Sequence, residues 1–114
     1  MIHEMNLRSI YFDKIKAGEK IYEIRLNDEK RKLIDVGDVI VFKREPEKTE
    51  TLKTVVKDLI YFDSFIEMST TLPLEKVGFE NQSLEEVVAV YHQFYNEEME
   101  KKYGVLAIKV EVIG

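Results

Sequence analysis

The sequence predicts an α+β protein built on a small mixed or antiparallel β-barrel of about five or six strands, with short flanking helices and one longer helix in its second half. Apolar and polar residues alternate with a period of two in several segments, of which 51–61 and 105–113 are the longest. Residues 83–101 instead repeat apolar side chains every three or four positions, as an amphipathic helix does. Five or six strands are enough to close a small barrel.

The length of 114 residues predicts one compact domain over residues 1–114. Hydrophobic residues make up 45% of the chain, and we find no repeat or low-complexity run, which argues against disorder. The chain shows no long apolar run and no secretion signal, so we expect a cytoplasmic protein without a membrane partner. The absence of cysteine excludes disulfides and thiolate catalysis.

Short elements follow one another at the start of the chain. Residues 3–7 predict a strand, and Ser9 predicts the N-cap of a brief helix that Gly18 ends. After a strand that carries several charges, the dipeptide 27–28 offers an N-cap to a single charged turn over residues 29–33.

A hairpin is predicted next. Residues 39–43 form its first strand, which Pro46 ends, and residues 51–61, rich in β-branched side chains, form a long return strand. Asp63 is the predicted cap of a short helix that runs through Met68.

The periodic helix over residues 83–101 is the strongest local prediction. Ser83 and Glu86 have the spacing of a capping box, and Gly104 follows the helix end. Its apolar stripe consists of Leu84, Val87, Val88, Tyr91, Phe94, Tyr95 and Met99. A stripe at this spacing is typical of core packing rather than of a base-stacking platform. We make an exception for Tyr95, whose phenol lies near the helix end and is placed to close one side of a cleft.

The net charge of −5 is unevenly distributed. Residues 1–57 carry 13 Lys and Arg against 11 Asp and Glu, a balance of +2, whereas residues 58–114 carry 4 against 11, a balance of −7. Proteins that grip a long duplex are usually basic overall. The charge therefore favours a mononucleotide, a nucleoside or a short single-stranded RNA as ligand.

The segment from Gly18 to Arg25 concentrates charge at the start of the second strand. Alternation places Glu23 and Arg25 on the same face of this strand, and Lys20 lies in the turn before it. One interpretation is an exposed ion-pair ladder, which contributes about 0–1 kcal/mol. The other is a polar cleft that grips an anion or the edge of a nucleobase.

These residues resemble a known family. Gly18, Lys20, Glu23 and Arg25 match the G-x-K-x-x-E-x-R signature of ASCH (activating-signal-cointegrator homology) domains. The resemblance extends to residues 7–15, 35–42 and 102–105, and so covers most of the chain. It implies a small single-domain member with the PUA-like β-barrel that is found in several RNA-associated modules.

The resemblance also implies a function, namely binding of an RNA segment or a nucleotide-type ligand in a cleft beside the signature strand. We expect Lys20 and Arg25 to meet a phosphate or a carbonyl group. Glu23 would orient Arg25 or accept a hydrogen bond from an exocyclic amine, and Arg8 and Tyr95 would rim the site.

A hydrolase is the main alternative. One bacterial branch of ASCH proteins consists of amidohydrolases that act on N4-acetylcytidine, with a lysine, a threonine and a glutamate as proposed working residues. The lysine falls on Lys20 and the glutamate on Glu80, in the loop expected across the cleft, but the threonine position is Glu23 here. Glu23 cannot form the same acyl intermediate, so hydrolysis would need Glu23 or Glu80 as a general base, with Lys20 or Arg25 holding the oxyanion.

A third possibility is a protein-interaction or regulatory module that uses the acidic second half and is indifferent to nucleotides. Other chemistry is poorly supported. His3 and His92 lie 89 positions apart and belong to no zinc pattern, and the chain has no Gly-x-Ser-x-Gly and no phosphate-binding Gly-Lys-Ser/Thr loop. We therefore expect no metal and no cofactor, and the sequence does not define an oligomeric state.

Overall fold

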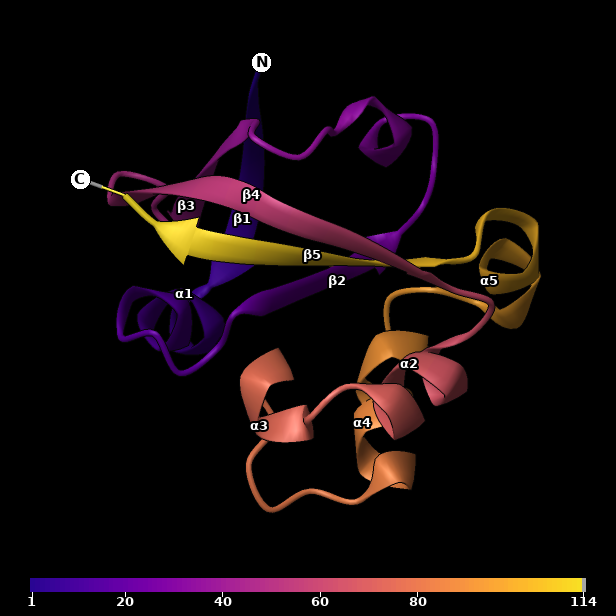
Figure 1. Cartoon of the computed structure of the whole chain (residues 1–114). Helices are drawn as coiled ribbons and strands as arrows, with labels where there is room; N and C mark the ends of the chain where they lie inside the picture. The colour runs from indigo at the N-terminus through magenta and orange to yellow at the C-terminus, as the bar shows by residue number, and fades with distance from the viewer. Residues whose placement is uncertain (114) are drawn as a thin grey trace.

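The computed structural model describes residues 1–113 and shows an α+β fold (Figure 1). Its strands are β1 (Ile2–Arg8), β2 (Tyr22–Leu26), β3 (Val39–Glu45), β4 (Thr51–Phe62) and β5 (Val105–Val112). Its helices are α1 (Ser9–Lys16), the 3-10 turn η1 (Arg31–Leu33), α2 (Phe65–Thr71), α3 (Leu74–Val77), α4 (Leu84–His92) and α5 (Glu97–Tyr103). Within residues 1–113, no helix has both the length and the apolar character needed to cross a bilayer.

The five strands form one mixed, curled sheet in the order β1-β3-β4-β5-β2. The β1–β3 pair is parallel and the other three pairs are antiparallel. The sheet curls into a half-barrel, which confirms the predicted fold class. Strands β1 and β2 are the two edges of this sheet, and they are linked by a side chain: Arg25 Nη2 donates to the carbonyl of Asn6 at 2.9 Å. The open seam of the barrel therefore lies between β1 and the charged strand.

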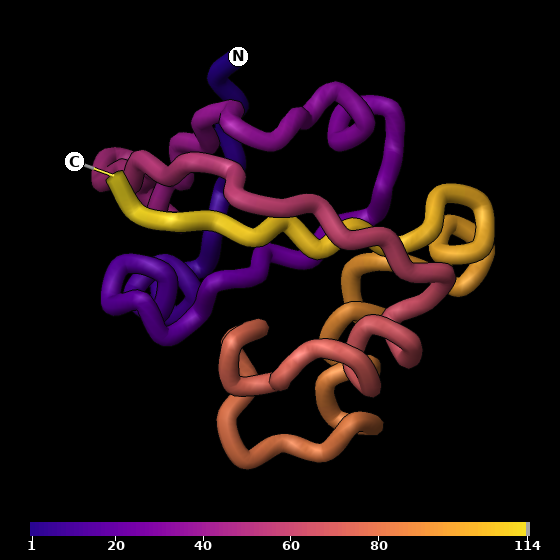
Figure 2. The backbone as a smooth tube through the Cα atoms, viewed as in Figure 1, coloured from indigo at the N-terminus to yellow at the C-terminus, as the bar shows by residue number. Residues whose placement is uncertain are grey.

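Two apolar cores lie on opposite faces of the sheet, and β5 contributes to both. Leu106 and Ile108 belong to the core inside the curl, while Val105 and Ala107 belong to the core beneath the helices. This division follows the two-residue period of a strand that is buried on both faces. Figure 2 shows the chain from α2 to α4 gathered on one side of the long β4–β5 pair. The helical layer and the curl thus meet along β5 and β2.

The predicted helix over residues 83–101 is wrong in its length, because it is two helices. Helix α4 ends at His92, and α5 begins after Asn96, whose side-chain oxygen accepts a hydrogen bond from the Met99 amide at 2.8 Å. Asparagine favours such a cap over a helix interior. Because α4 ends at His92, Phe94 no longer lies on the apolar face of that helix. Its side chain is 53% exposed instead of lying in the core.

Other local predictions are confirmed or shifted by a few residues, except the Ser9 cap, which is wrong: α1 begins at Ser9, and its N-cap is Arg8 without a side-chain hydrogen bond. The capping box is present: the Glu86 amide donates to Ser83 Oγ, and the Ser83 amide donates to the Glu86 carboxylate. Helix α2 is capped by Ser64, one residue after the predicted Asp63. Helix α3, which the sequence did not predict, is a single turn that ends at Gly78.

Candidate functional site

Strand β2 places two charged side chains on the inner face of the curl. In the antiparallel β2–β5 pair, Glu23 lies opposite Ile108 and Arg25 opposite Leu106, and both of these partners belong to the inner core. Directly opposite residues point to the same face of a sheet. Because β2 is an edge strand, the two charges face the open seam rather than the closed interior.

Lys20 is buried beside them, with 3% of its surface exposed. Its Nζ donates to the carbonyls of Tyr22 at 2.5 Å and Val77 at 2.7 Å, and it lies 3.3 Å from Glu23 Oε1. An ammonium group has three protons. Each proton of Lys20 therefore has an acceptor within the protein.

Glu23 is held between two cations. Its Oε2 lies 2.7 Å from both Nε and Nη2 of Arg25, while its Oε1 faces Lys20. The carboxylate side chain is only 8% exposed. We call Lys20, Glu23 and Arg25 the buried triad. Its burial excludes the exposed ion-pair ladder as an interpretation of this strand.

Electrostatics fix the charge states around the triad. Burial alone would raise the pKa of Glu23, but the attraction of Arg25 and Lys20 outweighs it and holds the pKa below its usual value. Burial lowers the pKa of Lys20, and Glu23 opposes that shift. Burial also raises the pKa of Tyr91 and of Tyr11, and the Glu23 charge adds to both shifts. The carboxylate is therefore ionised at neutral pH, whereas both phenols keep their protons.

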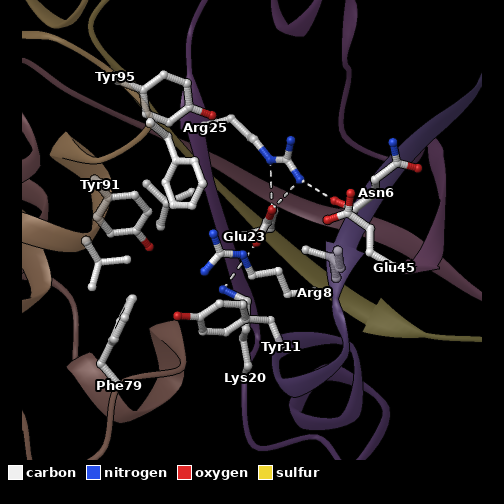
Figure 3. Close-up of a pocket in the computed structure, with 14 residues that line it drawn as sticks. Asn6, Arg8, Tyr11, Lys20, Glu23, Arg25, Glu45, Phe79, Tyr91 and Tyr95 are labelled. Atoms are coloured by element: carbon white, nitrogen blue, oxygen red, sulfur yellow. Dashed lines mark hydrogen bonds and ion pairs between the residues drawn. The ribbon is translucent and has the colours of Figure 1, made fainter. Parts of the chain in front are cut away.

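A pocket of about 350 Å³ opens over the triad, at the seam between β1 and β2 (Figure 3). One wall is aromatic, and its rings are Tyr11, Phe79, Tyr91, Phe94 and Tyr95. Asn6, Arg8 and Glu45 line it from the ends of β1 and β3. The pocket thus combines several aromatic rings with a mixed set of charges.

The buried part of the aromatic wall packs against other rings of the core. The Tyr91 ring stacks on Phe65 with centroids 4.8 Å apart, and it meets Phe79 edge-on at 5.8 Å. At the mouth, the guanidinium carbon of Arg8 lies 4.7 Å from the centre of the exposed Phe94 ring. Arg8 and Phe94 come from opposite sides of the pocket, so they mark its entrance.

Five residues predicted from the sequence to bind ligand do surround this one pocket, namely Arg8, Lys20, Glu23, Arg25 and Tyr95. Glu80 does not, because it is exposed and lines a separate shallow hollow beside Asn81 and Gln82. No pattern in the sequence pointed to Asn6 or Glu45, because only the parallel β1–β3 pairing brings them to the seam.

The two histidines each pair with one carboxylate away from this pocket. His3 Nε2 lies 2.8 Å from Asp38, and His92 Nε2 lies 2.9 Å from Glu100. Over residues 1–113, no group of three or more His, Asp or Glu side chains is placed to hold a metal ion. Both histidines therefore act as links between elements of the fold.

Comparisons with known proteins agree with this architecture. The model of the ASCH domain family matches residues 5–114. The hypothetical protein PH0355 has a crystal structure with a TM-score of 0.89 at 49% identity, over 99% of this chain and 100% of that one. Protein PF0455 from Pyrococcus furiosus has a TM-score of 0.78 at 43% identity, over 99% and 98%.

A more distant structure shares the fold alone. A single-residue mutant of the ZmASCH protein from Zymomonas mobilis has a TM-score of 0.68 at 10% identity, over 96% of this chain and 68% of that one. No curated protein matches the sequence. With its curled mixed sheet, its signature strand and a family match over nearly its whole length, the chain belongs to the ASCH domain family.

Proposed function

We propose that this pocket binds one nucleotide unit, either within a short single-stranded RNA or as a free nucleotide. The observation that carries the proposal is the pairing of two guanidinium groups with an aromatic wall in one cavity. The guanidinium groups suit a phosphate, and the rings suit a base. A volume of about 350 Å³ fits the range of about 300–1,000 Å³ that is typical of small-ligand sites.

The guanidinium groups are arranged differently but both have donors to offer. Arg25 is held by Glu23 and by the Asn6 carbonyl through Nε and Nη2, and its Nη1 has no acceptor among residues 1–113. Arg8 is stacked on Phe94 and makes no hydrogen bond to the described part of the chain through its guanidinium. A phosphate between them would receive hydrogen bonds from a fixed arginine and from an exposed one.

The aromatic wall supplies the other half of the recognition. Stacking of a base on an aromatic side chain contributes about 1–3 kcal/mol and tolerates any base. Phe94 and Tyr95 lie in the segment that separates α4 from α5, so the helix break is what turns these rings toward the seam. The net charge of −5 supports a single nucleotide unit rather than a long duplex.

In this arrangement, Glu23 orients Arg25 rather than reading the ligand. A carboxylate offers about four lone-pair positions. Arg25 and Lys20 occupy three of them, which leaves one on Oε1. Glu23 can therefore accept at most one further hydrogen bond, from an exocyclic amine.

The amidohydrolase alternative has less support from the geometry. The protons of Lys20 all have acceptors, so Lys20 is not free to act as a base or to hold an oxyanion. Glu80 faces a different hollow, and a glutamate stands where the amidohydrolases have threonine. We therefore place binding ahead of hydrolysis.

The test is a titration of a fluorescently labelled short RNA, followed by anisotropy, with wild type and two variants. Arg8→Gln should weaken binding about tenfold, because one charge-assisted contact is lost. Lys53→Gln is the charge-matched control, since Lys53 is exposed on β4 and does not line the pocket, and it should bind like wild type. Affinity should also fall with salt, with the shallow slope expected when one or two phosphates are neutralised.

Two results would overturn the proposal. If Arg8→Gln and Lys53→Gln weaken binding equally, the contact is a diffuse charge effect outside the pocket. If wild type ignores RNA and nucleotides while folded, the interaction-module alternative is favoured. Incubation with N4-acetylcytidine, analysed by mass spectrometry, tests the hydrolase alternative in the same preparation: deacetylated product that disappears in Lys20→Ala would establish it.

A further inference from the structure

The pocket contains one charged side chain that the protein does not use internally. Glu45 is the last residue of β3, half-buried, and lies beside Arg8 in the parallel β1–β3 register. Among residues 1–113, the side chain that bonds to Glu45 is that of Ser9, which donates to the Glu45 backbone carbonyl, and the Glu45 carboxylate makes no hydrogen bond and no ion pair. Arg8, its neighbour of opposite charge, turns instead toward Phe94. A carboxylate without a partner therefore lines a cavity that two arginines also line.

The chemistry of that carboxylate limits what it can bind. An ionised carboxylate only accepts hydrogen bonds, so its partner has to be a donor. A phosphodiester has no proton to donate, and any phosphate is an anion at neutral pH that the carboxylate repels. A sugar hydroxyl is a neutral donor, and it is the group that an acidic residue binds in dinucleotide sites.

The position of Glu45 fits a sugar. Figure 3 shows Glu45 and Asn6 together on one side of Glu23, with Tyr91 and Phe79 on the other. A nucleotide with its base against the rings and its phosphate on the arginines has its sugar between the two, where the sugar hydroxyls can turn toward Glu45. The Asn6 side chain, which is exposed next to Glu45, adds an amide that both donates and accepts.

We infer that Glu45 accepts a hydrogen bond from the ribose 2′-hydroxyl and makes the pocket select RNA over DNA. This inference rests on the proposed nucleotide binding. DNA lacks the 2′-hydroxyl, so a pocket built around Glu45 leaves that carboxylate unpaired beside a deoxyribose. Arg8 and the rings bind both nucleic acids, whereas Glu45 distinguishes them.

The test compares dissociation constants for a short single-stranded RNA, the DNA of the same sequence and the 2′-O-methyl RNA. Wild type should bind RNA about tenfold more tightly than DNA, the effect expected of one hydrogen bond to a charged group. The 2′-O-methyl RNA should behave like DNA, because it keeps the oxygen and loses the donor. Glu45→Ala should bring all three constants close together.

Glu47→Ala is the matched control. It removes the same charge from the exposed loop two residues further on, outside the pocket. It should keep the wild-type ratio of RNA to DNA affinity, even if both affinities rise. Glu45→Ala should fold normally, because Ser9 Oγ donates its hydrogen bond to the backbone carbonyl of Glu45, which the substitution leaves in place. A thermal unfolding curve checks this.

The outcomes separate this inference from the function on which it rests. A wild type that binds RNA and DNA equally, or a Glu45→Ala variant that keeps the RNA preference, overturns the role of Glu45 and leaves nucleotide binding intact. A folded wild type that binds neither nucleic acid overturns both.

Discussion

The molecule contains two groups of ion pairs, one buried and one largely exposed. The buried triad beneath the pocket has side chains that are 3%, 8% and 17% exposed. The second group, which we call the surface cluster, consists of Asp13, Lys16, Arg44 and Glu50, and three of its side chains are 45–60% exposed. Both groups bring opposite charges together beside a strand. The comparison teaches that burial, rather than the presence of ion pairs, decides how much a charge network contributes to stability and to function.

The contacts of the surface cluster are no poorer than those of the triad. Arg44 pairs with Asp13 and donates from Nε to Glu50 at 2.9 Å, and Lys16 lies 3.2 Å from Glu50. Its carboxylates also have lowered pKa values, because the side chain of Arg44 donates hydrogen bonds to them. Water competes for every one of these contacts, however, and it is largely excluded from the triad.

The largest effect should come from Glu23→Gln. The substitution keeps the shape of the side chain but leaves two buried cations without their counter-ion, which should lower the free energy of unfolding by about 3–5 kcal/mol. Urea denaturation measures this loss of unfolding free energy. Glu50→Gln in the surface cluster is the matched control and should change stability far less. A Glu23→Gln loss below about 1 kcal/mol would place the triad in the same class as an exposed pair.

Acid should reveal the same difference. The folded pKa of Glu23 lies below its unfolded value near 4.5, so its contribution to stability is complete above pH 4.5. That contribution is lost as the pH falls below 4.5 through the folded pKa. Wild type should therefore lose more stability than Glu23→Gln between about pH 5 and about pH 3. Parallel acid profiles of the two proteins, followed by circular dichroism, would contradict this linkage.

The packing of neighbouring residues against the triad can be tested at Gly78, where the backbone has φ +109°. A Cβ there would lie 3.1 Å from Lys20 Cδ and 3.3 Å from the Tyr11 ring. Gly37 has φ +94° and open space around it, so Gly37→Ala carries the backbone strain alone, about 1–2 kcal/mol. Gly78→Ala should be the more destabilising of the two in thermal unfolding, and it should also weaken RNA binding. Equal losses would show that the packing on Lys20 is loose.

Salt should produce the smallest effect and should act on one group only. At about 1 M salt the screening length is about 3 Å, so the small stability difference between wild type and Glu50→Gln should shrink further. The difference between wild type and Glu23→Gln should persist, since water and ions reach the triad poorly. Urea denaturation at low and high salt measures both differences. If salt shrinks the stability difference between wild type and Glu23→Gln as much as that between wild type and Glu50→Gln, the distinction between the triad and the surface cluster is lost.

The sequence was most informative where structure is local. Alternation along residues 21–26 predicted that Glu23 and Arg25 share a face, and the Ser83 and Glu86 spacing predicted a capping box that the structure contains. The helix break was missed because the apolar period continues on both sides of Asn96. The start of α5 depends instead on one hydrogen bond to the Asn96 side chain. Local patterns thus identified the elements better than their ends.

The pocket was only partly predictable, because its walls come from distant segments. The signature strand supplied three of its residues, whereas Asn6, Glu45 and Phe79 reach it through the strand order and the packing of the helices. Burial was also hidden, since the charge pattern over residues 20–25 does not show whether these side chains are exposed or buried. Glu80 was placed across the cleft by resemblance, but after α3 it is exposed and lines a second hollow instead of the pocket.

The most direct test of the central claim is a two-dimensional NMR titration of isotope-labelled protein with a short single-stranded RNA. The predicted result is a saturable set of shifts at Arg8, Arg25 and Tyr95, which lie on different elements but line one pocket. Shifts confined to residues outside the pocket, or none in a folded protein, would contradict the claim that the buried triad supports a nucleotide-binding site.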